Sequence, residues 1–540
     1  VFAADPMQAS VTTTREGVGL SPLLQHPAMM IHPPIVFAGY SLWAAPCALA
    51  FAALRQTNLN PQWTMLARPW ALVAWLTLGV GILLGANWAY EELGWGGYWG
   101  WDPVENGSLM PWLTGSALIH ALMVWRKRGG MKKTAVSLAI GTFALCNFAT
   151  FLTRSGIFSS LHAFSESPIG WMFLALMALL VIAGLILGAS RRESLVATGA
   201  MRSLVARETL IVIATGLLLL LTAVVLMGTL SLPLSMYVFD RQGVVGAPFY
   251  NAVLTPIGLS LLAVTAAVPL LRWGAAPTPS QRKMLMASAA AALALTGMAV
   301  LLGVRQWQGL AVTALSAMTV ITFVVALVQE AMAKFPHRPL LGAMRTLREK
   351  RRAYAGYIIH LGFVCLAIGI TGSSLATQRR EAEMRPGDSL RWANREIRFV
   401  KLHQRELDDK FVVEAELEIA DEAGVYRLRP ARHQYRLQEQ WTTEVAIHSD
   451  WSGDFYTILQ YGDTSGAVSL TLIDNPLMRF VWLGGLITIC GATLSLIPVS
   501  KTTDVATREE KLRSPIKRPH ILDHNQAAQE GSRQPMHSRR

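Results

Sequence analysis

The chain has 540 residues, of which 52% are hydrophobic and only 15% are charged. Because soluble globular proteins carry about 25% charged residues, this composition excludes an ordinary soluble domain and predicts an all-α polytopic membrane protein. The net charge of +13 does not predict a nucleic-acid partner, since most Lys and Arg residues fall in short loops on one side of the membrane.

Eleven apolar runs of about membrane length follow one another along the sequence. The predicted transmembrane helices lie near residues 33–54, 69–89, 109–125, 134–152, 169–190, 209–231, 253–271, 284–303, 308–330, 355–376 and 477–499. Clusters of Lys and Arg follow every second helix from the third onward, at residues 126–133, 191–207, 272–283 and 334–352. By the positive-inside rule these clusters are cytoplasmic, so the intervening loops face the periplasm of a bacterium whose inner (plasma) membrane holds the chain.

One sizeable hydrophilic segment, residues 377–475, falls on the outer side. Apolar and polar residues alternate within it, at 410–419 and 467–472, which is typical of half-buried strands. We therefore expect one small periplasmic β-rich domain. The predicted organisation is a transmembrane core at 1–376 with a tryptophan-rich loop near 88–112, the β-rich domain at 377–475, a last transmembrane helix at 476–499 and a disordered cytoplasmic tail at 500–540.

Four cysteines, Cys47, Cys146, Cys365 and Cys490, all lie in apolar spans. None belongs to a CxxC pair, which excludes a thioredoxin-like redox motif, a zinc knuckle and a disulfide framework. The sequence contains no CxxCH, so the chain is not itself a c-type cytochrome. It begins with Val1 rather than Met, and no signal-peptide pattern precedes the first span, so we expect further residues upstream.

The most distinctive segment, WGGYWGWDPVENGS at residues 95–108, lies between two apolar spans. It contains Trp95, Trp99 and Trp101 together with one Tyr and four Gly. Large aromatic faces suit a flat apolar ligand, and glycines let a ligand approach the backbone closely. The alternative is an aromatic belt at the membrane surface, where Trp and Tyr are enriched, but a belt does not explain the glycines.

The same segment predicts a helix start. Asp102 can accept hydrogen bonds as an N-cap, Pro103 is tolerated at the first helical position, and Glu105 completes a capping box.

Two histidines are expected inside the membrane at one depth. His120 lies six residues before the cytoplasmic cluster at 126–133, and His360 lies about five residues into the tenth span. At 1.5 Å per residue, both fall on the order of 8–9 Å from the cytoplasmic end. Ionisable residues in a membrane are costly and usually functional, and haem iron accepts axial imidazoles, so the pair predicts a bis-histidine haem b. The alternative is two unrelated histidines, each hydrogen-bonded within the bundle.

A second pair, His32 and His162, falls on the outer side with the tryptophan-rich loop. A haem resting on the aromatic side chains could take one axial ligand from each, and Arg154 could pair with a propionate. The alternative is that these histidines are simply hydrated, as we expect for the nearby His26.

Four long motifs resemble one family. Residues 95–113, WGGYWGWDPVENGSLMPWL, resemble the tryptophan-rich WWD signature of the haem-handling proteins of cytochrome c maturation. The motifs LLQHPAMMIHPPIVFAGY (23–40), FLTRSGIFSSLHAF (151–164) and YIIHLGFVCLAIGI (357–370) narrow the resemblance to haem lyase subunits of the CcmF/NrfE type. The resemblance covers nearly the whole chain. Family members carry further spans upstream, and the β-rich domain diverges more than the core.

The resemblance implies specific roles. The loop, with Trp95, Trp99, Trp101 and Asp102, would bind transient haem delivered by a periplasmic haem chaperone of the CcmE type. His32 and His162 would be the axial ligands of this haem. His120 and His360 would hold a separate haem b that helps to reduce it. The further partners implied are apocytochrome c, thiol-reducing maturation subunits of the CcmH type and the lipid bilayer.

The predicted activity is that of a haem lyase that joins haem by thioether bonds to the CxxCH cysteines of apocytochrome c. Binding and positioning are the protein's task, since the haem carries the reactive vinyl groups. No general base for the thiol is evident in the sequence. The alternative is a haem transporter or scaffold without ligation activity. A transporter should show inverted repeats and helices broken at the midplane, and no clear repeat is found.

Overall fold

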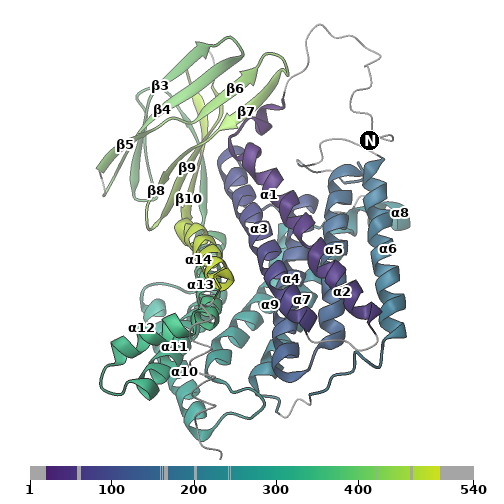
Figure 1. Ribbon diagram of the computed structural model, residues 1–540. Helices are drawn as coiled ribbons and strands as arrows, with labels where there is room; N and C mark the ends of the chain where they lie inside the picture. Colours follow the sequence, from purple (N-terminus) through teal and green to yellow (C-terminus); the bar gives the residue numbers. More distant parts are fainter. Residues whose placement is uncertain are drawn as a thin grey trace, which may run out of the picture. The chain divides into compact units, whose positions relative to one another are not determined.

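The computed structural model describes residues 20–56, 62–158, 160, 162, 168–199, 203–240, 243, 245–422, 424–462 and 466–498. In this part of the chain, eleven helices are long and apolar enough to cross a membrane. The fold class is therefore confirmed as a helical, multi-pass membrane protein with one β-rich domain (Figure 1). The predicted tail at 500–540 lies outside the described residues.

The first half of the described chain contains one short 3₁₀ helix and seven α-helices. They are η1 (Pro22–Leu24), α1 (Ala28–Leu42), α2 (Ala44–Arg55), α3 (Gln62–Glu92), α4 (Pro103–Arg128), α5 (Lys132–Arg154), α6 (Ile169–Ser190) and α7 (Arg207–Thr229). Within this group α3 packs against α1 and α4, and α4 packs against α5 and α7. Their shared core is unusually rich in Ala and Trp, and Trp43 at its centre is fully buried. Small residues let helices approach closely where lipid provides no hydrophobic driving force.

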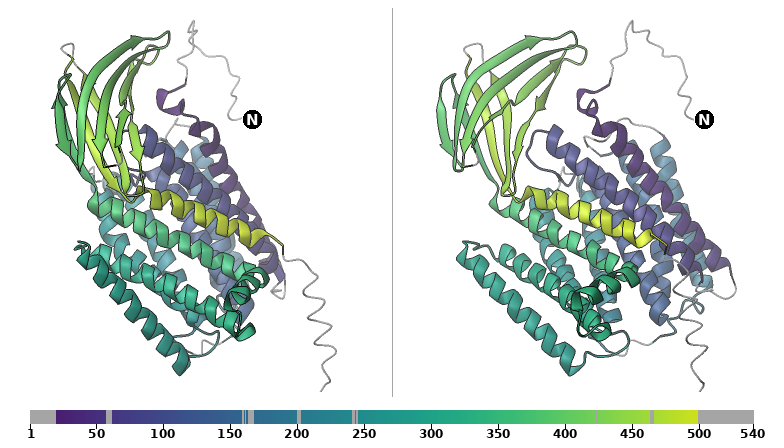
Figure 2. Two further views of the ribbon diagram at one scale, coloured as in Figure 1. Left: turned by 90° about the vertical axis from the view of Figure 1, so that its left-hand side faces the viewer. Right: turned by 60° about the vertical axis from the view of Figure 1, so that its left-hand side comes forward.

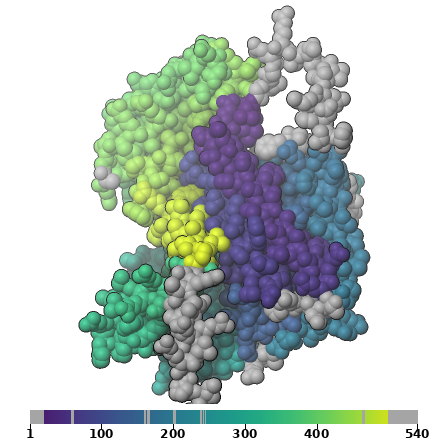
Figure 3. All heavy atoms as spheres, viewed as in Figure 1, coloured from purple at the N-terminus to yellow at the C-terminus, as the bar shows by residue number. Residues whose placement is uncertain are grey.

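The second half continues with α8 (Ser231–Phe239), α9 (Ala247–Ala267), η2 (Val268–Leu270), α10 (Pro279–Leu301), α11 (Trp307–Lys334), α12 (Pro339–Glu349), α13 (Arg351–Ala376) and α14 (Met478–Leu496). Helices α13 and α14 lie side by side in both views of Figure 2. Glycine makes this close packing possible, since a Cβ atom on Gly369 would lie 2.6 Å from the backbone nitrogen of Val481. Helix α14 also packs on α3, and Figure 3 shows it beside the purple N-terminal helices.

Two helical segments differ from the sequence prediction. The third span, predicted near 109–125, begins at Pro103, because the polar Asn106 in its first turn is paired within the bundle. The cytoplasmic loop predicted at 334–352 contains the short helix α12, whose buried residues Gly342 and Thr346 are spaced for one helical face. Both differences arise because tertiary packing compensates side chains whose polarity interrupts an apolar run.

The β-rich domain is built from antiparallel strands that form two sheets. The strands are β1 (Gln378–Met384), β2 (Ser389–Trp392), β3 (Arg395–Glu406), β4 (Lys410–Asp421), β5 (Gly424–Leu428), β6 (Ala431–Tyr435), β7 (Gln440–Glu444), β8 (Ala446–Ser449), β9 (Gly453–Gly462) and β10 (Val468–Pro476). The sheet orders are β1-β10-β9-β8 and β2-β3-β4-β6-β7, and β5 pairs with β4. The two layers, seen in Figure 2, enclose a core that includes the fully buried Phe399, Leu417 and Phe455.

The β-rich domain is connected directly to two transmembrane helices. Strand β1 follows α13, and β10 leads into α14, so the sheet that contains both strands continues from this helix pair (Figure 1). At the junction Thr377 Oγ1 donates a hydrogen bond to Asn475 Oδ1 over 2.8 Å. The first strand and the last are therefore joined where the domain meets the helices.

Candidate functional site

A cavity of about 400 Å³ lies among α1, α3 and the start of α4. This volume falls within the range of about 300–1,000 Å³ that is usual for small-molecule sites. Four residues singled out from the sequence line it together: His32, Trp99, Arg154 and His162. The structure thus brings the two outer histidines to one cavity, although they are 130 positions apart in the sequence. His26 instead faces Glu91, with 3.5 Å between His26 Nε2 and Glu91 Oε2.

His32 is held in a defined orientation by a backbone carbonyl in the second half of its neighbour α3. Its Nδ1 atom lies 2.8 Å from the carbonyl oxygen of Gly81, which can only accept a hydrogen bond, so Nδ1 carries the proton. In the neutral ring Nε2 is then the unprotonated nitrogen that is able to bind a metal. Gly85 provides the space for the ring, because a Cβ atom there would lie 2.5 Å from His32 Cε1.

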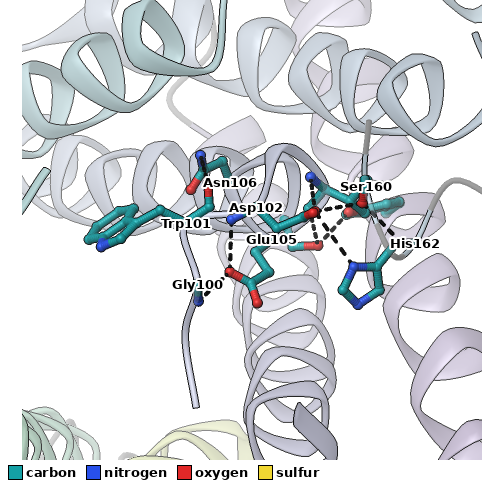
Figure 4. Close-up of polar contacts among 10 residues, drawn as sticks. Gly100, Trp101, Asp102, Glu105, Asn106, Ser160 and His162 are labelled. Carbon is teal, nitrogen blue, oxygen red and sulfur yellow. Dashed lines mark hydrogen bonds and ion pairs between the residues drawn. The ribbon is translucent and has the colours of Figure 1, made fainter. Parts of the chain in front are cut away.

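His162 faces the capping residue of α4. Its Nδ1 atom lies 3.5 Å from Asp102 Oδ1, and its ring packs edge-on against the buried Trp88, with 5.7 Å between ring centroids. Ser160 connects the two residues, since its hydroxyl donates to Asp102 Oδ1 over 2.7 Å and accepts from the His162 N–H over 3.0 Å (Figure 4). The loop that carries His162 is therefore attached to the start of α4 through the Asp102 carboxylate.

Asp102 is ionised and serves two groups at once. Burial alone would raise the pKa of this carboxyl group, but the His162 ring, the Ser160 hydroxyl and the Val104 N–H stabilise the anion and hold its pKa below 3.8. The predicted capping box is confirmed, with Val104 N–H donating to Asp102 Oδ1 over 2.8 Å and Asp102 N–H donating to Glu105 Oε2 over 3.1 Å. Asp102 is thus placed to orient His162 rather than to line the cavity.

The three tryptophans of the loop have separate environments. Trp99 lines the cavity, whereas Trp101 stacks on Tyr250 of α9 with 4.5 Å between ring centroids and 9° between ring planes. Trp101 Nε1 also donates to Asn251 Oδ1 over 3.2 Å. Trp95 is 39% exposed, and its ring covers Gly97. The expected aromatic surface is therefore divided: one indole faces the cavity and the other two pack elsewhere.

Trp101 has a backbone conformation that non-glycine residues seldom adopt, with φ of 58°. Such strain persists only where the surroundings impose it. The side-chain amide of Asn106 is well placed to do so, because Nδ2 donates to the Trp101 carbonyl oxygen (Figure 4) and to Thr229 Oγ1, each over 3.1 Å. This bend turns the two indoles in different directions, so that the Trp99 and Trp101 rings meet edge to face, with centroids 6.0 Å apart and planes at 87°.

The glycines at the start of the loop contact protein rather than the cavity. A Cβ atom on Gly96, which has φ of 79°, would collide with Ile473 of β10, and one on Gly97 would collide with the Trp95 ring. Asn475 of β10 donates from Nδ2 to the Gly96 carbonyl oxygen over 3.0 Å and to the Tyr90 hydroxyl over 3.1 Å. The β-rich domain therefore holds the start of the tryptophan-rich loop.

The second histidine pair lies far along α4 from this cavity. At 1.5 Å per residue, His120 is about 26 Å from the start of α4. The rings of His120 and His360 have centroids 6.1 Å apart and planes at 83°. With a metal–nitrogen distance of about 2 Å on each side, two imidazoles that bind one metal from opposite sides have centroids on the order of 6 Å apart. The separation therefore fits joint ligation.

The hydrogen bonds of this pair fit ligation as well. Nδ1 of His120 lies 2.8 Å from the Ser116 carbonyl oxygen, and Nδ1 of His360 lies 2.6 Å from the Gly356 carbonyl oxygen. Each Nδ1–H donates to the carbonyl one helical turn earlier and leaves Nε2 unprotonated, which is the tautomer that metal-binding histidines use. Among the residues that the structure describes, no group of three or more His, Cys, Asp or Glu is arranged around a metal position. Two-histidine ligation of a haem requires no such group.

One cavity residue was identified from the sequence only as part of a helix cap. Glu105 lines the cavity, and its Oε2 atom accepts hydrogen bonds from the N–H groups of Gly100 and Asp102 over 2.9 and 3.1 Å. Tyr40 and Ser108 also line it and are joined by a hydrogen bond of 2.7 Å. The sequence places Glu105 and Ser108 about one helical turn apart, but it does not show that α1 faces them across a cavity.

Two family models match the chain. One, described as "Cytochrome C assembly protein", matches residues 2–159, and the other, described as "CcmF C-terminal beta-sandwich", matches residues 375–476. The first match covers the tryptophan-rich loop and the lining residues of the cavity other than His162, and the second covers the β-rich domain.

Several characterised proteins are similar in sequence. "Cytochrome c-type biogenesis protein CcmF" of Pseudomonas aeruginosa is 35% identical over 500 residues, which cover 92% of this chain and 75% of the relative. The protein of the same name from Escherichia coli is 34% identical over 511 residues, covering 92% and 75%. "Cytochrome c-type biogenesis protein NrfE" of Haemophilus influenzae is 29% identical over 501 residues, covering 92% and 76%.

A solved structure shares the fold. "Cytochrome c Heme Lyase CcmF" superimposes with a TM-score of 0.73 at 24% identity, covering 88% of this chain and 73% of that chain. The helical bundle and the β-rich domain are thus a known combination.

Proposed function

Because this chain belongs to the CcmF family of cytochrome c-type biogenesis proteins, we propose that it is a haem lyase of cytochrome c maturation. It receives haem from a periplasmic haem chaperone of the CcmE type and attaches it by thioether bonds to the CxxCH cysteines of apocytochrome c. Thiol-reducing subunits of the CcmH type keep these cysteines reduced. The observation that carries the proposal is the convergence of His32, His162, Trp99 and Arg154 on one cavity.

In the proposed reaction the cavity holds haem as a substrate. His32 and His162 are the axial ligands, and the proton on Nδ1 of His32 directs its Nε2 atom to the iron. Trp99 provides an aromatic face for the porphyrin, and Arg154 pairs with a propionate. Trp95, Trp101 and Asp102 act less directly, since they support the loop and orient His162.

His120 and His360 are proposed to hold a second, resident haem b. When bound, this group supplies a one-electron redox centre that reduces the incoming haem. The protein contributes two neutral imidazoles whose Nδ1 protons are donated to the carbonyls of Ser116 and Gly356. Both rings are thereby held in one orientation before any metal binds.

The proposed setting is the bacterial inner membrane, with the tryptophan-rich loop and the β-rich domain in the periplasm. Support comes from the basic residues of the loops at 126–133 and 334–352, which mark the cytoplasmic side. We also propose that residues 1–376 form the haem-handling core, that 377–475 form a periplasmic domain for partner contacts, that 476–499 form the last transmembrane helix and that 500–540 form a cytoplasmic tail.

The proposed function is tested by removing the two cavity imidazoles. In cells that carry the complete maturation system and a reporter apocytochrome c, His32→Gly and His162→Gly should each abolish covalent haem on the reporter. Added free imidazole should partly restore attachment, because a small ligand can enter the vacated space. Gly216→Ala is the matched control, since a Cβ atom there contacts nothing within 4 Å.

Two results would contradict the proposal. The first is normal holocytochrome c formation in the double variant His32→Gly with His162→Gly. The second is normal haem attachment to the reporter when this chain is deleted and haem is supplied to the periplasm, which would favour a transporter or scaffold.

A further inference from the structure

The cavity is lined by a carboxylate, of which only one oxygen takes part in the helix cap. Glu105 lines the cavity beside Trp99 and His162, at the third position of α4. Its Oε2 atom accepts both cap hydrogen bonds, from Gly100 and Asp102. Within the described part of the chain, Oε1 accepts no hydrogen bond, and Figure 4 shows it turned away from the two N–H groups. A second carboxylate oxygen is thus left for another partner.

The other ionisable groups that line the cavity have other partners or roles, or cannot accept a proton. The His32 ring donates to Gly81 and is a proposed iron ligand, as is His162. The hydroxyls of Tyr40 and Tyr98 are paired with Ser108 and Ser373, and phenols have an ordinary pKa of about 10, which makes them poor proton acceptors. Arg154 is a cation. Of the described residues that line the cavity, Glu105 is the one with a carboxylate.

We propose that Glu105 is the general base of thioether formation, an inference that rests on the proposed lyase function. The reaction adds a cysteine S–H group across the C=C bond of a haem vinyl group. As sulfur bonds to the vinyl carbon next to the ring, Oε1 of Glu105 takes the thiol proton and then returns it to the terminal carbon, which becomes a methyl group. The S–H and C=C π bonds break, the C–S and C–H bonds form, and no oxidant or reductant is consumed.

This arrangement suits the chemistry for two reasons. A carboxylate is a weaker base than a thiolate, so proton transfer must accompany C–S bond formation, which requires the base to be positioned beforehand. The cap provides that positioning, because two N–H groups hold Oε2 and leave one direction for Oε1. The same two bonds would exist if Glu105 were only a cap, so the test must separate the roles.

The substitution Glu105→Gln separates the capping role of this side chain from its role as a proton acceptor. Capping boxes accept Glu or Gln at this position, so Glu105→Gln keeps an oxygen for Gly100 and Asp102 but cannot take a proton. Glu105→Ala removes both functions. Glu381→Gln is the matched control, since Glu381 is an exposed residue of β1.

The full-length variants are expressed with the complete maturation system and a reporter apocytochrome c. Covalent haem is measured on the denatured reporter, and haem binding is measured separately by absorption with mesohaem, whose ethyl groups cannot form thioethers. We expect Glu105→Gln to lower the attachment rate by about 10²–10⁴-fold, the usual contribution of a general base, and to bind mesohaem like the wild type. Glu381→Gln should match the wild type in both assays.

Each other outcome is decisive. Attachment within threefold of the wild type in Glu105→Gln overturns the assignment and leaves Glu105 as a cap. Loss of mesohaem binding in Glu105→Gln also overturns it, because the residue would then act in binding. If the wild-type chain itself supports no covalent attachment, the proposed function fails independently of Glu105.

Discussion

The Asp102 carboxylate lies 3.5 Å from Nδ1 of His162 while it caps helix α4. One side chain therefore connects the end of the tryptophan-rich loop to a ring that lines the cavity. A histidine that binds a metal through one nitrogen commonly has a carboxylate or carbonyl at the other, which determines its tautomer. The geometry makes Asp102 a positioning residue, and this role can be separated from the cap.

Replacing Asp102 tests this separation. Asp102→Asn should keep the cap, since Asn is among the best N-cap residues, but should weaken haem capture by the cavity because the charge beside His162 is lost. Asp102→Ala should also destabilise the helix start by about 1 kcal/mol. Thermal unfolding in detergent measures the cap, and absorption after haem addition measures capture. Wild-type capture in both variants would exclude the positioning role.

The pH dependence of this effect follows from the lowered pKa of Asp102. A carboxyl group with a folded-state pKa below its unfolded value stabilises the fold above the unfolded value of 3.8, and this stabilisation disappears as the pH falls through the folded value. The unfolding temperatures of wild type and Asp102→Asn should therefore differ by a constant amount between pH 7 and pH 5. The difference should narrow below about pH 4. A difference that already vanishes at pH 5 would contradict the lowered pKa.

Gly85→Ala should displace His32. The added Cβ atom would lie 2.5 Å from Cε1 of the ring, which is closer than real contacts allow. We expect loss of haem capture in the cavity with the His120–His360 haem b unchanged, measured as the reduced-minus-oxidised absorption spectrum. The control Gly258→Ala places a Cβ atom with nothing within 4 Å and should behave like the wild type. Normal capture in Gly85→Ala would mean that His32 is not a ligand.

The membrane histidines should act as a unit. Replacing either His120 or His360 with Ala should abolish the spectrum of the resident haem b, because one remaining imidazole cannot provide both axial bonds. Mesohaem binding to the cavity should persist, since His120 lies about 18 Å further along α4 than Ser108, the last α4 residue that lines the cavity. A full haem b signal in the double variant would refute the assignment.

Asn475 should be needed for the position of the tryptophan-rich loop. Asn475→Ala removes the donors to the Gly96 carbonyl and the Tyr90 hydroxyl and should destabilise the protein by roughly 1–3 kcal/mol, because buried polar groups lose their partners. Proteolysis within the loop should become faster, and haem capture should weaken. Gln404→Ala, at an exposed position of β3, is the control and should change neither. Unchanged proteolysis in Asn475→Ala would show that the loop is held by other contacts.

The fold class could be predicted from the sequence because its signals are local. Apolar runs of membrane length, basic clusters after every second span and strict alternation in strands each depend on neighbours along the chain. The capping box at Asp102 and Glu105 was predicted for the same reason, and the structure contains it. Charge and hydropathy also placed His32 and His162 on the same side of the membrane, and in the structure both line one cavity.

Only the tertiary structure decided which residues meet. The sequence treats Trp99 and Trp101 alike, but the strained backbone at Trp101 directs one indole to the cavity and stacks the other on Tyr250 of α9. Likewise only the structure shows that His32 fits against Gly85 and lines the cavity, whereas His26 lies 3.5 Å from Glu91. That Glu105 lines a cavity together with residues of α1 could be seen only in the structure. Contacts between residues far apart in the chain depend on helix packing, which no local pattern encodes.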